Sequence, residues 1–234
     1  MIWSQTASGR PLDLLAPIPP DGLDLRRDIA TPLGMTGRYA NQMPSGIIYP
    51  VAQHCCIGAD TIYAASHDPA AALAFLLHDG HEAIIGDWAT PIMVAMQAAA
   101  DRLAPGSGVS IKAIKRELCA PIDAWLHRLA GLPWPLPVEI ARTVALTDVR
   151  LMLAERDHLL ARPPRPWGVE SYGTLKLKHR IVPLSPARAT EQWLTRFDRW
   201  SEAVLARPAP KPKSDLPPST RRAGGRLPRQ PMEA

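Results

Sequence analysis

Apolar residues recur at helical spacing along most of the chain, and clusters of proline and glycine separate the resulting segments. The stretch from residue 70 to 85 is strongly apolar, and Asp68-Pro69 before it has the form of an N-cap followed by a first-turn proline. Thr90-Pro91 has the same form at the start of the next segment. The pattern predicts helices over residues 28–33, 51–65, 70–85, 92–103, 111–129, 138–160 and 187–206.

The two ends of the chain lack this pattern. Residues 1–24 are rich in proline, and we expect an extended lead-in there. Residues 208–234 contain seven prolines and no apolar periodicity, which predicts a basic, disordered tail. Between them, residues 25–207 are predicted to form one all-α domain of about six or seven helices, and a length of 234 residues suits such an organisation.

Composition and charge narrow the function classes. Proline accounts for 26 of the 234 residues, about twice its usual share, which disfavours long strands. The net charge is +5, but residues 208–234 alone carry +4, so the body is nearly neutral. A nucleic-acid-binding fold would normally carry its charge on the body, so we expect at most non-specific contact with nucleic acid through the tail.

The cysteines and the hydropathy point to a cytoplasmic protein. Cys55, Cys56 and Cys119 show no CxxC spacing, which disfavours a disulfide framework and a structural zinc ribbon. The N-terminus lacks the basic and apolar regions of a signal peptide. No apolar run reaches the roughly 18 residues of a membrane-spanning helix, so we expect no membrane association.

Two His-Asp pairs differ in their surroundings. His67-Asp68 lies in a turn before a proline, where capping explains it. His78-Asp79 follows the apolar run from Leu73 to Leu77, in the last turns of the predicted helix, where a buried pair needs a partner such as a metal ion. His54 lies about 18 Å of helix before the intervening turn, and His78 lies about 14 Å after it. In an antiparallel hairpin, His54 and the His78-Asp79 pair therefore meet at the same end.

Asp148 is the candidate for a fourth ligand. It lies in an otherwise apolar helical stretch, where an unpaired aspartate is a poor helix former and is expensive to bury. Two histidines and two aspartates, with room for water, suit a borderline or hard divalent ion in a catalytic site. The sequence therefore predicts one divalent metal ion, which could be Zn, Co, Mn or Mg.

These residues and their neighbours resemble the HD-domain phosphohydrolases, in particular the bacterial 5′-deoxynucleotidases and the phage-type deoxynucleotide triphosphohydrolases. The resemblance covers about residues 25–205 and implies an HD-type helical bundle as the domain at 25–207. Its ordered H…HD…D set is specific, whereas an HD pair alone is not. The segments that carry it are residues 49–54 (YPVAQH), 76–83 (LLHDGHEA), 86–87 (GD), 90–91 (TP), 132–137 (LPWPLP), Asp148 and 185–187 (SPA).

The resemblance implies a role for each site residue. The implied metal ligands are His54, His78, Asp79 and Asp148. The family's acidic pair corresponds to Glu82 and Asp87, which would orient or deprotonate the attacking water and protonate the leaving oxygen. Arg38 matches the family's phosphate-binding arginine, and Tyr39 matches an aromatic residue near the sugar.

The implied reaction is attack of a metal-activated water on phosphorus, which makes the protein a hydrolase of nucleotide metabolism. Deoxynucleoside monophosphates are the favoured substrates, and a deoxynucleoside triphosphate triphosphohydrolase is the alternative. A lower alternative is a non-catalytic interaction protein recruited through the basic tail. The implied partners are a nucleotide and further copies of this chain, as a dimer or larger homo-oligomer.

The remaining histidines leave alternatives open. His81 stands where the family carries a small residue; it could bind a second metal, contact phosphate or face solvent, and exposure is favoured. His127 and His158 lie on charged helix faces and are expected to be solvated. Cys55 and Cys56 follow a predicted ligand without ligand spacing, so burial in the core is favoured for both.

Overall fold

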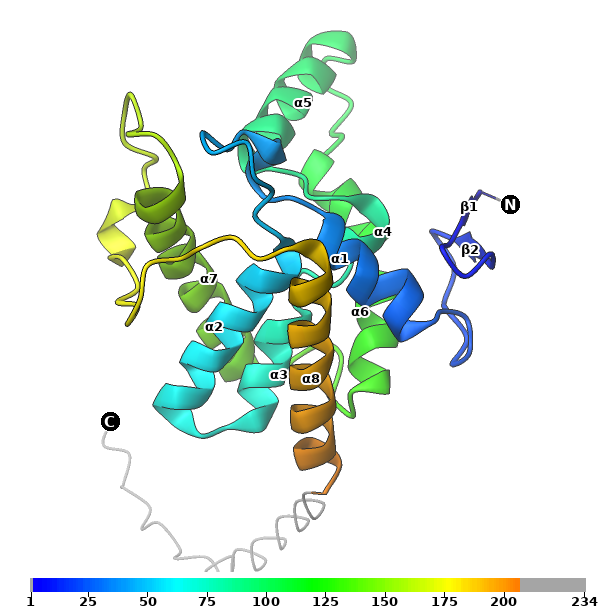
Figure 1. The fold of residues 1–234 in the computed structure, drawn as a ribbon. Helices are drawn as coiled ribbons and strands as arrows, with labels where there is room; N and C mark the ends of the chain where they lie inside the picture. Colours follow the sequence, from blue (N-terminus) through cyan, green and yellow to red (C-terminus); the bar gives the residue numbers. More distant parts are fainter. Residues whose placement is uncertain (1, 207–234) are drawn as a thin grey trace, which may run out of the picture.

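Helices α2 (Val51–Ser66), α3 (Pro69–Leu77) and α8 (Pro186–Leu205) pack against one another at the centre of the fold (Figure 1). The computed structural model describes residues 2–206, so the tail predicted at 208–234 lies outside the described residues. The all-α prediction is confirmed, because the only sheet among these residues is a two-stranded hairpin. The other helices are η1 (Leu25–Ala30), α1 (Thr31–Met35), η2 (Tyr39–Asn41), α4 (Glu82–Ile85), α5 (Thr90–Leu103), α6 (Ile111–Leu129), α7 (Val138–Leu159) and η3 (Glu170–Tyr172).

Local sequence explains the α2–α3 hairpin. The Asp68 carboxylate accepts a hydrogen bond from Ala70 N, and Pro69 occupies the first turn of α3, as predicted. Gly58 on α2 faces the Phe75 ring of α3 so closely that a Cβ at this position would overlap the ring. The hairpin therefore depends on a residue without a side chain at the crossing point.

The aromatic stripe of the last helix is buried in the core. Trp193, Phe197 and Trp200 are at most 5% exposed, and the Trp193 indole donates to the Leu76 carbonyl across 3.1 Å. Helix α8 thereby covers α3 on one side, while α7 and α6 pack on α3 as well. Helix α5 is different: none of its 14 residues is buried, and it projects from the bundle (Figure 1).

The helix predicted over residues 70–85 is broken in the structure. Helix α3 ends at Leu77, four residues form a turn, and α4 begins at Glu82. The turn brings Gly80 against the Leu126 side chain of α6, where a Cβ would overlap Leu126. Tertiary packing therefore interrupts an apolar pattern that reads as one continuous helix.

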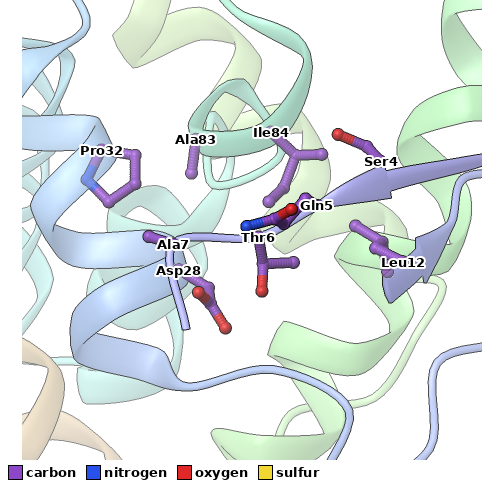
Figure 2. A pocket seen from close by; sticks show the side chains of 9 residues that line it. All are labelled: Ser4, Gln5, Thr6, Ala7, Leu12, Asp28, Pro32, Ala83 and Ile84. Carbon is purple, nitrogen blue, oxygen red and sulfur yellow. The ribbon is translucent and has the colours of Figure 1, made fainter. Parts of the chain in front are cut away.

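The N-terminal lead-in is more ordered than the prediction of an extended segment suggests. Strands β1 (Trp3–Gln5) and β2 (Pro11–Asp13) form an antiparallel hairpin. The buried Asp28 carboxylate holds this hairpin to η1 by accepting hydrogen bonds from Ser8 N at 2.7 Å and Ser8 Oγ at 2.8 Å. A small pocket of about 90 Å³ lies between the hairpin segment and α4 (Figure 2).

Among residues 2–206, no single helix has the length and apolar composition needed to cross a membrane. Pro69–Ile85 and Thr90–Leu103 meet the requirements of length and composition only when they are taken together, and this pair is bent by 53°.

Candidate metal centre

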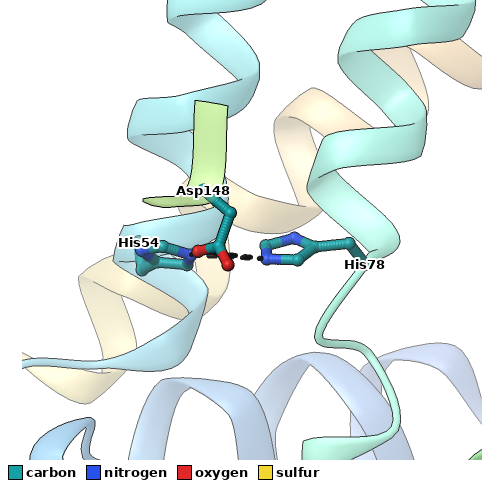
Figure 3. Close-up of side chains that lie close together, drawn as sticks. All are labelled: His54, His78 and Asp148. Carbon is teal, nitrogen blue, oxygen red and sulfur yellow. Dashed lines mark hydrogen bonds and ion pairs between the residues drawn. The ribbon is translucent and has the colours of Figure 1, made fainter. Parts of the chain in front are cut away.

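Three separate helical segments bring two imidazoles and two carboxylates together. His54 lies in the first turn of α2, His78 and Asp79 follow α3, and Asp148 lies in the middle of α7. His54 Nε2 is 3.2 Å from Asp148 Oδ1 and 3.7 Å from Asp79 Oδ2. His78 Nε2 is 3.2 Å from Asp79 Oδ2 and 3.7 Å from Asp148 Oδ1. The two Nε2 atoms are 3.4 Å apart, and Asp148 points between the two rings (Figure 3).

These atoms could hold a divalent cation. His54, His78 and Asp148 each offer one ligand atom, all within 4.8 Å of one another. Burial works to raise the pKa of Asp148, but its contacts with His54 and His78 hold that pKa well below the ordinary value. The cluster thus combines ionised carboxylates with imidazole nitrogens, a donor set that suits a borderline or hard divalent cation.

Glu155, which is not among the site residues predicted from the sequence, orients the His54 ring. Its side chain is fully buried, and Oε1 lies 2.6 Å from His54 Nδ1. Burial works to raise the pKa of Glu155, but the Arg38 charge and the His54 contact lower it to about 2. Because an ionised carboxylate only accepts, Nδ1 carries a hydrogen, which leaves Nε2, the atom that faces Asp148, as the nitrogen that could bind a metal. Glu155 lies seven residues after Asp148 on α7, and this two-turn spacing was the available signal.

Arg38 and Tyr39 lie beside the cluster, and both form hydrogen bonds with the Glu155 carboxylate. Arg38 donates to Glu155 Oε2 from Nε at 3.1 Å and to Asp79 Oδ2 from Nη1 at 3.2 Å. The Tyr39 hydroxyl donates to Glu155 Oε2 at 2.7 Å. Residues Tyr39–Asn41 all have positive φ, near 50–60°, a conformation that is costly for side-chain-bearing residues and clusters at functional sites.

Glu82 and Asp87 both lie near the candidate metal ligands. Glu82 is 4% exposed, its Oε2 has no hydrogen-bond partner, and it offers an oxygen within 4.8 Å of an Asp79 oxygen. Burial raises the pKa of Glu82 well above its ordinary value, and the charges of Asp79 and Asp87 raise it further. Burial also raises the pKa of Asp87, against the opposing charge of Arg38. Both carboxyls therefore hold a proton more readily than an exposed carboxyl group does, which suits groups that transfer protons.

The sequence favoured a solvent-exposed His81 and predicted a solvent-exposed His127, and both predictions are wrong. His81 is 8% exposed, and its Nδ1 lies 3.0 Å from Asp123 Oδ1 of α6. Burial opposes the protonation of His81, but the hydrogen bond with Asp123 raises the pKa to about 10. His127 is 1% exposed because α6 turns this part of its charged sequence toward the core. Cys55 is buried, as expected, and burial raises the pKa of its thiol to about 11.

A cleft of about 680 Å³ opens at Asp79 and runs between α5 and α6. Its α5 wall includes Met93 and Val94, whereas its α6 wall carries positively charged side chains. His81 lines the same cleft, together with Cys119. The candidate metal centre therefore lies at one end of a space that is large enough for a small-molecule ligand.

Fold and site together define a helical protein with a His/Asp cluster that could hold a metal ion. No protein-family model matches the chain. The chain is 32% identical over 149 residues to an uncharacterized protein of Rhodobacter capsulatus, a match that covers 62% of this chain and 67% of that protein. The chain belongs to the same family as this Rhodobacter protein.

Proposed function

We propose that this chain is a metal-dependent phosphohydrolase of the HD type that cleaves phosphate esters of (deoxy)nucleotides. The observation that carries the proposal is the meeting of His54, His78, Asp79 and Asp148 with ligand atoms less than 4 Å from their neighbours. Their order along the chain is the order that the resemblance to HD phosphohydrolases predicted. A buried glutamate that fixes the His54 ring supports a metal-binding role, because such outer contacts orient ligating histidines.

The residues around the cluster suit hydrolysis of a phosphate ester. A divalent ion held there would supply Lewis acidity, which lowers the pKa of water and polarises a phosphoryl oxygen. The Arg38 guanidinium, fixed by Glu155, has further N–H groups with which to bind a phosphate. Glu82 accepts a proton from the attacking water through its unpaired Oε2. Water oxygen then bonds to phosphorus, the bond to the nucleoside oxygen breaks, and Asp87 protonates that oxygen.

The test is phosphate release from a panel of deoxynucleoside mono- and triphosphates, measured with Zn²⁺, Co²⁺, Mn²⁺ or Mg²⁺. We expect turnover that a chelator abolishes and that the same metal restores. Asp148→Asn removes an anionic ligand, so it lowers both the bound metal, measured by elemental analysis, and kcat by at least about 100-fold. Asp157→Asn is the matched control, because Asp157 lies on the same helix and contacts the neighbouring Arg156 at the surface.

Two results would contradict the proposal. One is a fully metallated chain that leaves the whole nucleotide panel unchanged. The other is turnover that Asp148→Asn and Asp157→Asn reduce equally. A chain that lacks residues 208–234 keeps its turnover if the helical body is the enzyme, whereas an interaction protein that acts through its tail loses its binding in the same variant.

A further inference from the structure

Three basic residues line the cleft between α5 and α6, and none of them is among the site residues predicted from the sequence. Lys112, Lys115 and Arg116 fall at positions i, i+3 and i+4 of α6, so they lie on one helix face. Lys112 and Arg116 are one turn apart, about 6 Å along the helix axis. The wall that continues from the metal centre is therefore strongly cationic over more than the width of one phosphate.

Most of this charge is unneutralised within the described residues. Lys115 Nζ lies 3.9 Å from Glu82 Oε1, but Lys112 and Arg116 form no ion pair with a residue between 2 and 206. Unpaired cations that share a cleft repel one another, and an anionic ligand would relieve this repulsion. The opposite wall, on α5, contributes Met93 and Val94, so the anion would meet its charge partners from the α6 side.

His81 and Asp79 both lie at this cleft. His81 is 8% exposed, its Nδ1 lies 3.0 Å from Asp123 Oδ1, and its ring lines the cleft together with Cys119. Asp79, one of the four candidate metal ligands, also lines the cleft, so the cleft adjoins the candidate metal centre.

We propose that this cleft is a subsite for the distal phosphates of a nucleoside triphosphate, held by Lys112, Lys115 and Arg116. The proposal rests on the proposed function, since it assumes that the phosphate nearest the nucleoside lies at the metal centre beside Arg38. A monophosphate bound there would leave the α6 cations without a partner. The proposed substrate class is therefore the nucleoside triphosphate. The sequence predicted this class only as the alternative and favoured the monophosphate.

The direct test is calorimetric titration of inorganic tripolyphosphate and, separately, inorganic phosphate into the full chain, with Mg²⁺ in excess over the anion. We expect tripolyphosphate to bind at least about tenfold more tightly than phosphate, because charge-assisted contacts add up along the cleft. Lys112→Ala/Arg116→Ala should weaken tripolyphosphate at least about tenfold and phosphate less than about twofold. The matched control is Lys176→Ala/Lys178→Ala, which removes two exposed charges elsewhere on the chain and leaves both affinities unchanged.

Lys115 is left intact in this test because it contacts Glu82. Equal affinities for the two anions, or tripolyphosphate binding that the α6 variant does not weaken, would overturn the subsite. The titration needs no turnover, so it separates this proposal from the proposed function. If monophosphates are hydrolysed while tripolyphosphate binds no better than phosphate, the hydrolase stands and the subsite fails. If tripolyphosphate binding depends on α6 but no nucleotide is hydrolysed, the proposed function fails instead.

Discussion

Four hydrogen-bond donors converge on the two oxygens of Glu155, which makes Glu155→Gln a sharp test of how the site is built. Oε1 accepts from His54 Nδ1 at 2.6 Å and from the Tyr49 hydroxyl at 2.8 Å. Oε2 accepts from the Tyr39 hydroxyl at 2.7 Å and from Arg38 Nε at 3.1 Å. A glutamine has nearly the same shape but offers one oxygen and one NH₂ group. Whichever way the amide is turned, one pair of partners faces the NH₂ group, where a tyrosine hydroxyl must turn to accept and the nitrogen donor beside it loses its acceptor.

The size of the effect follows from this geometry. Each buried donor that loses its acceptor costs about 1–3 kcal/mol, so we expect the free energy of unfolding to fall by about 2–5 kcal/mol. If the NH₂ group faces His54, the favoured tautomer places the hydrogen on Nε2, the atom that faces Asp148. Loss of an outer partner of this kind weakens metal binding by about 10–100-fold.

Two measurements check the prediction. Guanidinium unfolding of the metal-free chain gives the stability change, and Zn²⁺ titration against a competing chelator gives the metal affinity. Glu139→Gln is the matched control on the same helix, because the Glu139 side chain is 81% exposed and its effect should stay within about 0.5 kcal/mol. If Glu155→Gln and Glu139→Gln agree in both measurements, the orienting role assigned to Glu155 is refuted.

Three further predictions concern the fold around the site. Gly58→Ala places a Cβ against the Phe75 ring and should lower the free energy of unfolding by about 1–3 kcal/mol in denaturant titrations. Asp28→Ala leaves the Ser8 amide without its partner and should lower stability by a similar amount, about 1–3 kcal/mol, with faster hydrogen exchange at Ser8. The folded-state pKa of His81, raised from 6.5 to about 10, contributes stability that is complete below pH 6.5 and is lost as the pH rises through 10. Unfolding free energies measured from pH 6 to pH 10 should therefore decline.

Each of these has its own control. Phe75→Leu should restore part of the stability in the Gly58→Ala background, and no recovery would argue against ring overlap. Asp21→Ala removes an exposed carboxylate from the same lead-in, so an effect as large as that of Asp28→Ala would contradict the anchoring role. Asp123→Asn should flatten the decline of stability with pH, and an unchanged slope would show that other groups cause it.

Much of the site could be predicted from the sequence because its signals are local. The caps and apolar periodicity place His54 near the start of one helix and His78 in the last turns of the next predicted helix, and an antiparallel hairpin brings these two ends together. Asp148 could be found as an aspartate in an apolar helical stretch. For Glu155 the two-turn spacing from Asp148 was a weak signal, because a glutamate near the end of a charged helix looks solvent-exposed until α2 and α7 pack together.

The sequence by itself determined the all-helical class, most helix bounds and the residues that converge on the candidate metal centre. These features depend on apolar periodicity, helix capping and the cost of burying polar groups, all of which can be recognised from residues close together in the sequence. Only the tertiary structure decided the break after Leu77, the burial of His81 and Glu155, and the cationic wall that α6 adds to the cleft. Each of these depends on contacts between segments far apart in the chain, and such contacts determine which face of a helix is buried.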